Sequence, residues 1–278
     1  MELKQFSYAV ACSPFSIYNA AMSTTERKKR IGKGRSLLEL PNDYIVVDLE
    51  TTGLDPKEEK LIEIGAVKVI DGIVQATFQS FVKPGRPLSA RIVALTGITD
   101  EMLADAPLPK EVMGKFYEFC GDLPLLGHNL RFDYSFLKRA MVNEGYAFDK
   151  SGLDTLRIAR KYLPELESRR LEFLCGHFGI VHTAHRALGD AVATTELYGK
   201  LCELFYDKAQ KEDCKVFIPV PMIYNVKRQQ PISIPQKEQI LRYCAKLGIT
   251  LNRDLEQMTR SEASRFIEKY RLEYKALE

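Results

Sequence analysis

Two acidic residues, Asp48 and Glu50, stand two positions apart in the otherwise apolar run YIVVDLE at residues 44–50. In a β-strand, side chains two positions apart point to the same face, so both carboxylates are expected to face one site. Neighbouring carboxylates in an apolar strand are costly to desolvate unless a cation compensates their charge. Carboxylate oxygens are hard ligands that suit Mg²⁺ or Mn²⁺. An acidic pair at the solvent-facing end of a strand has the same pattern, so the pair indicates a metal site only together with further ligands.

Two aspartates farther along the chain could complete such a site. Asp133 falls in the first turn of a helix expected over residues 131–143, and it shares a face with the apolar stripe of that helix. Asp190 opens a second expected helix, over residues 187–206. A purely structural role is equally open for Asp133, because the positive end of a helix favours an acid there and Asn129 could cap the helix.

A histidine, His185, stands five positions before Asp190. Residues five apart on an α-helix differ by about 140° in direction, so the two side chains can face one site only if His185 precedes the helix, in a loop. A histidine with the ordinary pKa of about 6.5 can accept a proton from water at neutral pH, provided that metal ions offset the nearby carboxylates. His185 is therefore the candidate general base, with an ordinary surface histidine as the alternative.

The expected secondary structure places these residues on strands and near helix starts. The runs at 44–50, 61–70 and 73–82 have the composition of strands, and an Asp-Gly pair between the last two is a strong hairpin signal. A further short strand is expected at 123–126. Helical periodicity is found at residues 90–95, 110–120, 131–143, 154–162, 170–178 and 187–206. Strands followed by alternating helices predict an α/β fold with a mixed β-sheet flanked by helices.

Charge and composition divide the chain into four parts. Residues 1–38 carry seven Lys and Arg against two Asp and Glu, and we expect a flexible basic N-terminal extension. The catalytic domain is expected over 39–212, and 213–234 is expected to be a proline-containing linker. Residues 235–278, with nine basic and seven acidic side chains, have the apolar spacing of a small helical module. The net charge of −4 left for residues 39–234 fits a metal-loaded site for a polyanion between basic flanks, although ordinary solvated charge would explain the flanks equally well.

The overall composition is that of an ordinary globular protein, with 45% hydrophobic and 28% charged residues. No run approaches 18 uninterrupted apolar residues, so we expect no membrane-spanning helix and no membrane partner. Residues 1–22 are interrupted by polar side chains and contain a single basic residue, which is not typical of a signal peptide. The six cysteines are scattered without a CxxC pair, as in a reduced cytoplasmic protein. A cytoplasmic location is therefore expected.

Three segments together resemble the three motifs of the DEDDh (DnaQ-like) 3′-5′ exonuclease family, which includes the proofreading ε subunit of bacterial DNA polymerase III. The segments are VVDLETTGL at 46–54, GHNLRFDYSFL at 127–137 and HRALGDA at 185–191. Their order and expected contexts make the match specific, and it covers roughly residues 43–206. The related DEDDy group has a tyrosine four residues before the last aspartate, where this chain has Arg186. One departure is Thr96, which stands where many members have a histidine that contacts substrate.

The resemblance implies an RNase H-like fold and two divalent metal ions, Mg²⁺ or Mn²⁺. It assigns the first ion to Asp48, Glu50 and Asp190, and the second to Asp48 and Asp133. It makes His185 the group that deprotonates the attacking water. Five further positions border the terminal nucleotide in the family and are the candidate substrate-binding residues: Thr51, Thr52, Leu54, Asn129 and Phe132.

The implied activity is the release of nucleoside 5′-monophosphates from 3′ ends, with single-stranded DNA favoured over RNA and proofreading or repair as the setting. An exoribonuclease would keep the chemistry, and one sequence does not reveal the 2′-hydroxyl contact that distinguishes the two. An alternative of another class is a binding subunit whose C-terminal module or basic extension attaches to a polymerase or helicase. The complete acidic set with His185 argues against a purely binding role.

A competing pattern brings a cysteine close to three histidines, which superficially suggests zinc. The residues are Cys175, His177, His182 and His185. Cys175 follows a run of apolar residues, as a core residue near a helix end would, and His185 already completes the acidic set. Zinc binding is therefore the weaker interpretation.

Overall fold

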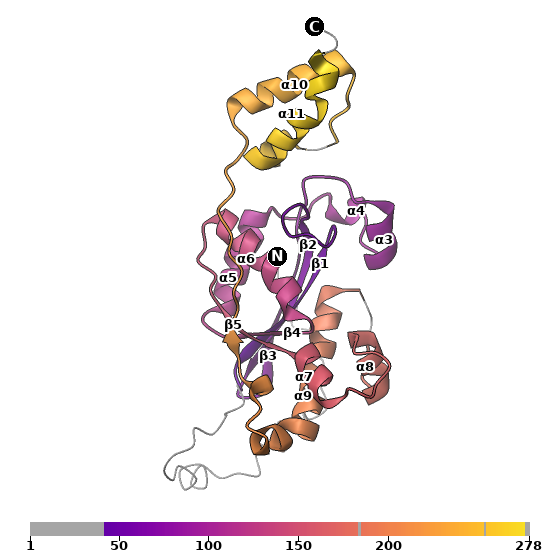
Figure 1. Ribbon diagram of the computed structural model, residues 1–278, viewed down its shortest axis with the longest axis vertical. Coiled ribbons are helices and arrows are strands. Elements are labelled where there is room, and N and C mark those ends of the chain that lie inside the picture. The colour runs from indigo at the N-terminus through magenta and orange to yellow at the C-terminus, as the bar shows by residue number, and fades with distance from the viewer. Residues whose placement is uncertain (1–41, 183–184, 253, 276–278) are drawn as a thin grey trace.

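The computed structural model describes residues 42–182, 185–252 and 254–275 (Figure 1). The N-terminal extension expected over residues 1–38 lies outside the described residues. Within the described part of the chain, no helix has both the length and the apolar character that crossing a membrane requires.

A six-stranded mixed sheet in the order β3-β2-β1-β4-β5-β6 forms the centre of the fold (Figure 1). Its strands are β1 (Tyr44–Thr51), β2 (Leu61–Ile70), β3 (Ile73–Phe81), β4 (Leu125–Gly127), β5 (Ser151–Asp154) and β6 (Val220–Pro221). β1 runs antiparallel to β2 and parallel to β4. The predicted hairpin joins β2 to β3, with Asp71 and Gly72 at φ angles of 52° and 74°, as a tight hairpin turn requires. The predicted mixed α/β architecture is confirmed.

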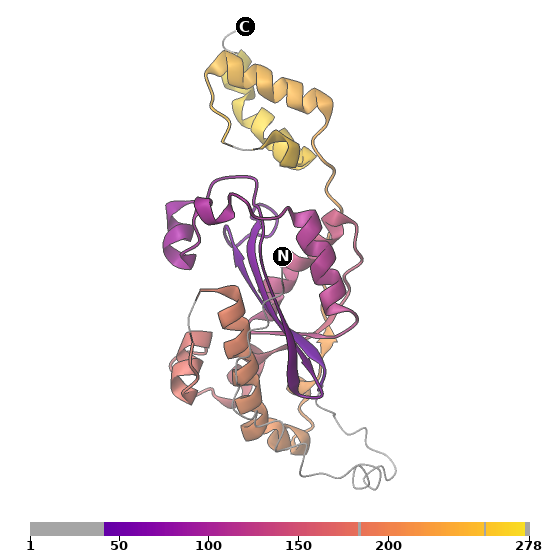
Figure 2. The same cartoon turned by 180° about the vertical axis from the view of Figure 1, so that it is seen from behind.

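Helices cover both faces of this sheet (Figure 2). One face carries α7 (Thr155–Tyr162), α8 (Leu171–Phe178) and α9 (Ala187–Lys211). The other face carries α5 (Pro109–Cys120) and α6 (Leu130–Glu144). Two short helices follow β3, and they are α3 (Ala90–Thr96) and α4 (Asp100–Leu103).

The central strand β1 explains how the two cores and the acidic residues are related. Tyr44 and Val46 pack in the core shared with α7, α8 and α9, whereas Ile45 packs in the core shared with α5 and α6. Side chains alternate between the two faces of a strand. Asp48 and Glu50 continue the row of Tyr44 and Val46, so their carboxylates are directed toward the face that α9 covers.

Residues 213–234, expected to be a linker, are packed on the sheet in their first part. Phe217, in the short 3-10 helix η1 (Lys215–Phe217), is buried in the core beside α9. Val220 then pairs with Gly152 of β5. Neither β5 nor β6 was located from the sequence, because both strands are too short to show periodicity and β5 contains no β-branched residue.

The C-terminal module consists of α10 (Ile234–Leu247) and α11 (Arg260–Lys275), and it lies beyond the loop that joins β1 to β2 (Figures 1 and 2). A capping box starts α11, because Glu262 accepts hydrogen bonds from the backbone N–H and the hydroxyl of Thr259. Glu262 also forms an ion pair with Lys60 of the β1–β2 loop, at 2.9 Å. The module has a small core of its own, formed by Ile232, Ile240, Met258 and Ala263.

Candidate active site

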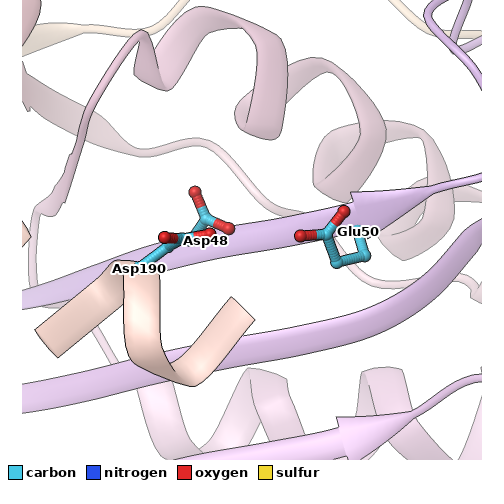
Figure 3. Close-up of side chains that lie close together, drawn as sticks. All are labelled: Asp48, Glu50 and Asp190. Carbon is cyan, nitrogen blue, oxygen red and sulfur yellow. The ribbon is translucent and has the colours of Figure 1, made fainter. Parts of the chain in front are cut away.

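Three carboxylates from one strand and one helix meet at the end of β1 (Figure 3). Asp48 and Glu50 come from β1, and Asp190 comes from the first turn of α9. One oxygen of each carboxylate lies within 4.8 Å of the others. Glu50 and Asp190 are buried and Asp48 is partly buried. A set of carboxylate oxygens at this spacing fits a hard divalent cation such as Mg²⁺ or Mn²⁺.

A glycine allows α9 to come this close to the sheet. Gly65 of β2 lies beside Asp48 in the β1–β2 ladder. A β-carbon at Gly65 would stand 2.0 Å from the backbone nitrogen of Leu188 and 2.1 Å from the carbonyl carbon of Ala187. The first turn of α9 therefore rests directly on the backbone of β2, and this contact brings Asp190 to β1.

The fourth predicted acid, Asp133, approaches from the first turn of α6 and is buried. It is not one of the three residues within 4.8 Å of one another, but its charge acts on Asp48. Asn129, the N-cap of α6, has a left-handed backbone with φ 67° and donates its N–H to Asp154, the N-cap of α7, at 2.9 Å. This corner between β4 and α6 directs Asp133 toward the site.

Crowding and burial change the acidity of these groups. Burial raises the pKa of Asp48 well above its usual 3.8, and the neighbouring carboxylates raise it further, Asp133 most. Burial raises the pKa of Glu50 to about 7, Asp190 adds to the effect, and Arg186 lowers it. Burial also raises the pKa of Asp133. Raised pKa values of this kind mean that the ionised carboxylates repel one another, and a cation bound between them would offset that repulsion.

His185 precedes α9, as its spacing from Asp190 requires. Its backbone is left-handed with φ 64°, its backbone N–H donates to Asp190 Oδ2 at 3.1 Å, and its side chain is exposed. A second histidine, His182, contacts the other carboxylate oxygen of Asp190 through Nε2. Sequence reasoning assigned no active-site role to His182, because this residue lies outside the motif at 185–191.

The loop after β1 carries three of the predicted substrate-binding residues. Thr51 is buried, and its hydroxyl donates to the carbonyl of Gly53 at 2.7 Å. Thr52 receives a hydrogen bond from Arg86 at 2.8 Å and donates its hydroxyl to Glu59, which closes the loop. Leu54 is 79% exposed. A large apolar side chain held out on an ordered loop is available to contact a base.

The other two predicted substrate-binding residues lie at the start of α6. Asn129 is exposed, although its backbone N–H is held by Asp154. The ring of Phe132 is half-buried and packs against Phe136, with ring centroids 5.0 Å apart. Phe132 shares the first turn of α6 with Asp133, and Asn129 is the N-cap of that helix.

The other two histidines, His128 and His177, contact residues outside the acidic cluster. His128 is held between the hydroxyl of Thr155 at 2.9 Å and the carbonyl of Arg169 at 2.8 Å, and burial lowers its pKa. Cys175 is buried in the core beside α9, while His177 is exposed and packs edge-on against its neighbour Phe178. The zinc interpretation is therefore not supported.

The segment that forms most of the sheet and this acidic cluster matches a known protein family. The family model described as "Exonuclease" matches residues 45–198, which is more than half of the chain. The chain belongs to the exonuclease family. The family predicted from the three motifs is thereby confirmed, and with it the enzyme class, a phosphodiester hydrolase.

Curated relatives of this exonuclease include DNA polymerases III of the PolC type. The protein of Caldanaerobacter subterraneus subsp. tengcongensis is 40% identical over 172 residues, which cover 61% of this chain and 12% of the relative. The protein of Bacillus subtilis is 43% identical over 171 residues, which cover 60% of this chain and 12% of the relative. The chain thus spans about an eighth of the length of these relatives.

Solved structures of exonucleases share the fold. Exonuclease X in complex with 5′ overhanging duplex DNA has a TM-score of 0.50 and 26% identity, covering 59% of this chain and 93% of that one. E. coli exonuclease I in complex with a dT13 oligonucleotide has a TM-score of 0.54 and 22% identity, covering 62% of this chain and 43% of that one. The second likeness concerns the fold alone.

Proposed function

We propose that this exonuclease releases nucleoside 5′-monophosphates from the 3′ ends of single-stranded DNA by metal-assisted hydrolysis. The observation that carries the proposal is the group formed by Asp48, Glu50 and Asp190, with one oxygen of each within 4.8 Å of the others. Asp133 lies close enough for its charge to raise the pKa of Asp48. Without a cation, four acids brought together from β1, α6 and α9 would destabilise the fold.

The acids divide between two metal positions. Asp48, Glu50 and Asp190 would hold the first ion, and Asp48 with Asp133 would hold the second. Bound Mg²⁺ or Mn²⁺ would supply positive charge that offsets the carboxylates and stabilises the developing charge on the phosphate oxygens. The burial of Glu50 and Asp190 keeps these ligand oxygens in fixed positions before the ions arrive.

His185 is the proposed general base. It stands ahead of α9 on an exposed bend whose backbone is tied to Asp190, so its imidazole can reach water near the carboxylates. His182 is the competing histidine, because Nε2 of His182 contacts Asp190 directly. That contact suits a role in holding Asp190, whereas the exposed side chain of His185 suits exchange of a proton with solvent.

The substrate is proposed from the chain's loops and from its relatives. Leu54 and Phe132 would pack against the terminal base, and the backbone of Thr51, Thr52 and Asn129 would contact the terminal nucleotide. DNA is favoured because the relatives are named as DNA polymerases and exonuclease X is bound to duplex DNA with a 5′ overhang. Proofreading or repair in the cytoplasm is the proposed setting, with a polymerase as the proposed partner of the chain.

Degradation of labelled oligonucleotides tests this proposal. The full chain with Mn²⁺ is incubated with matched single-stranded DNA and RNA of the same sequence, carrying the label at the 5′ end. A ladder that shortens one nucleotide at a time, with release of 5′-monophosphates and faster loss of DNA, is expected. Intact DNA with degraded RNA would make the chain an exoribonuclease, and release of mononucleotides from 5′ ends would contradict the direction.

Three histidine variants, one of them a control, test the general base. His185→Ala should lower the rate of cleavage by about 100-fold or more, the range in which general bases contribute. His177→Ala, which removes an exposed histidine of α8, is the matched control and should leave the rate unchanged. Loss of activity in His182→Ala together with a normal rate in His185→Ala would move the role of base to His182.

A further inference from the structure

Glu63 is a buried acid beside the active site that belongs to none of the three motifs. It lies on β2 directly opposite Glu50 in the β1–β2 ladder, and its side chain is 0% exposed. Its charge contributes to the raised pKa values of Asp48 and Glu50. Another buried carboxylate adds a desolvation cost and further repulsion to the acidic cluster, so its charge has to be compensated by neighbouring groups.

The compensation comes from the segment that starts α9. Arg186 donates to Glu63 through Nε at 3.2 Å and through a terminal guanidinium nitrogen at 2.9 Å. The backbone N–H of Ala187 donates to the same carboxylate at 3.3 Å. Gln79 of β3 completes the set with a hydrogen bond from its amide nitrogen at 2.9 Å. Glu63 is thus fully bonded, and two of its partners belong to the chain between His185 and Asp190.

The N-terminus of α9 depends on this carboxylate for its cap. Arg186, the N-cap residue, makes no side-chain capping hydrogen bond. The first amides of a helix have no partner within the helix, and a carboxylate placed there satisfies an N–H and interacts favourably with the helix dipole. Glu63 supplies this cap from a strand more than a hundred residues away in sequence.

We propose that Glu63 is a positioning residue which, through Arg186 and Ala187, fixes the start of α9 and thereby holds Asp190 and the backbone of His185 against β1. The bidentate pair fixes an orientation, because a guanidinium and a carboxylate bind each other in one plane. Gly65, two residues farther along the same face of β2, leaves room for α9 to approach the sheet. Glu63 then sets the position of α9. The role in catalysis rests on the proposed function, but the role in placing Asp190 does not.

Binding of Mn²⁺ to the protein without nucleic acid measures this role directly. Glu63→Gln cannot form the charged bidentate pair and presents an amide N–H₂ to the donors of Arg186. Its affinity for Mn²⁺, measured by calorimetry, should fall about 10- to 100-fold, the range seen when partners of metal ligands are removed. Its kcat on a DNA oligonucleotide should fall to a similar extent while KM changes little. Arg186→Lys keeps the charge but loses the planar geometry, and should lie between Glu63→Gln and wild type.

Controls separate positioning from simple loss of folding. Glu118→Gln, at an exposed position on α5, should bind Mn²⁺ as wild type does. Circular dichroism and thermal unfolding establish the folded fraction, and the affinity is expressed per folded molecule. Normal Mn²⁺ affinity in both Glu63→Gln and Arg186→Lys would overturn the proposal, even if the melting temperature fell. If wild type bound Mn²⁺ but cleaved no nucleic acid, the proposed function would fail while the Mn²⁺ comparison would still decide the role of Glu63.

Discussion

A hydrogen bond between Asp154 and Asn129 connects the start of α7 to the start of α6, the helices that follow β5 and β4. The carboxylate oxygen Oδ1 of Asp154 accepts the backbone N–H of Asn129 and that of Leu156, both at 2.9 Å. One side chain therefore caps α7 and also holds the left-handed residue at the start of α6. Since α6 carries Asp133 in its first turn, we expect Asp154 to control the direction of one of the four proposed active-site acids.

Replacing Asp154 by alanine should destabilise the protein by about 1–3 kcal/mol, because two backbone N–H groups lose their acceptor. The free energy of unfolding, measured with urea, checks this. Asp154→Asn keeps an oxygen in the same place and should retain most of the stability. Equal stability of the alanine variant and wild type would show that the corner is held by other contacts.

Gly65→Ala should damage both folding and activity. Its β-carbon would meet backbone atoms of Ala187 and Leu188, which cannot move without displacing α9. Overpacking of this kind costs about 1–3 kcal/mol. The melting temperature should fall, and at a temperature where the variant is folded the rate of cleavage should remain well below that of wild type. Gly176→Ala, on the open side of α8, is the matched control. A stable and fully active Gly65→Ala variant would contradict the close packing of α9 on β2.

The raised pKa of Glu50 predicts how stability depends on pH. Its pKa is about 7 in the folded protein against a usual 4.5, so between these values the folded state holds a proton that the unfolded chain has released. The free energy of unfolding of the metal-free protein should therefore fall as pH rises from about 4.5 to about 7. Mn²⁺ should raise the melting temperature little near pH 5 and much more near pH 8. A gain that is independent of pH would contradict this, and Glu50→Gln should reduce the dependence.

Glu262 links the C-terminal module to the loop that carries Leu54. Glu262→Gln keeps a residue suited to the capping box but removes the charge that pairs with Lys60. Because Lys60 is about one-third exposed, solvent weakens the pair, and the loss should be no more than about 1 kcal/mol. Hydrogen exchange should become faster in residues 52–60 and at the start of α11. Glu268→Gln, an exposed position on α11, should leave these rates unchanged. Unchanged exchange in Glu262→Gln would mean that the pair does not hold the loop.

Much of the fold and of the candidate site could be predicted, because it depends on the spacing of residues that are close together in the sequence. The two-residue spacing of Asp48 and Glu50 fixed their common face, and the five-residue offset placed His185 ahead of α9. The contacts of Glu63 with Arg186 were not predictable, because they depend on which strand residue lies beneath a helix start 123 positions later. The same holds for His182, whose contact with Asp190 depends on the path of the chain before α9.

The central claim is that the carboxylates gathered at the end of β1 carry out the hydrolysis. It is tested most directly by the rate at which Asp190→Asn releases mononucleotides from the 3′ end of single-stranded DNA, compared with wild type and with Asp105→Asn, an exposed aspartate after α4. Asp190→Asn keeps the size of the side chain and removes one of the three close carboxylates. We predict that its activity is lost almost completely while its circular dichroism is unchanged, and that Asp105→Asn keeps the wild-type rate. A folded Asp190→Asn variant that degrades DNA as fast as wild type would contradict the claim.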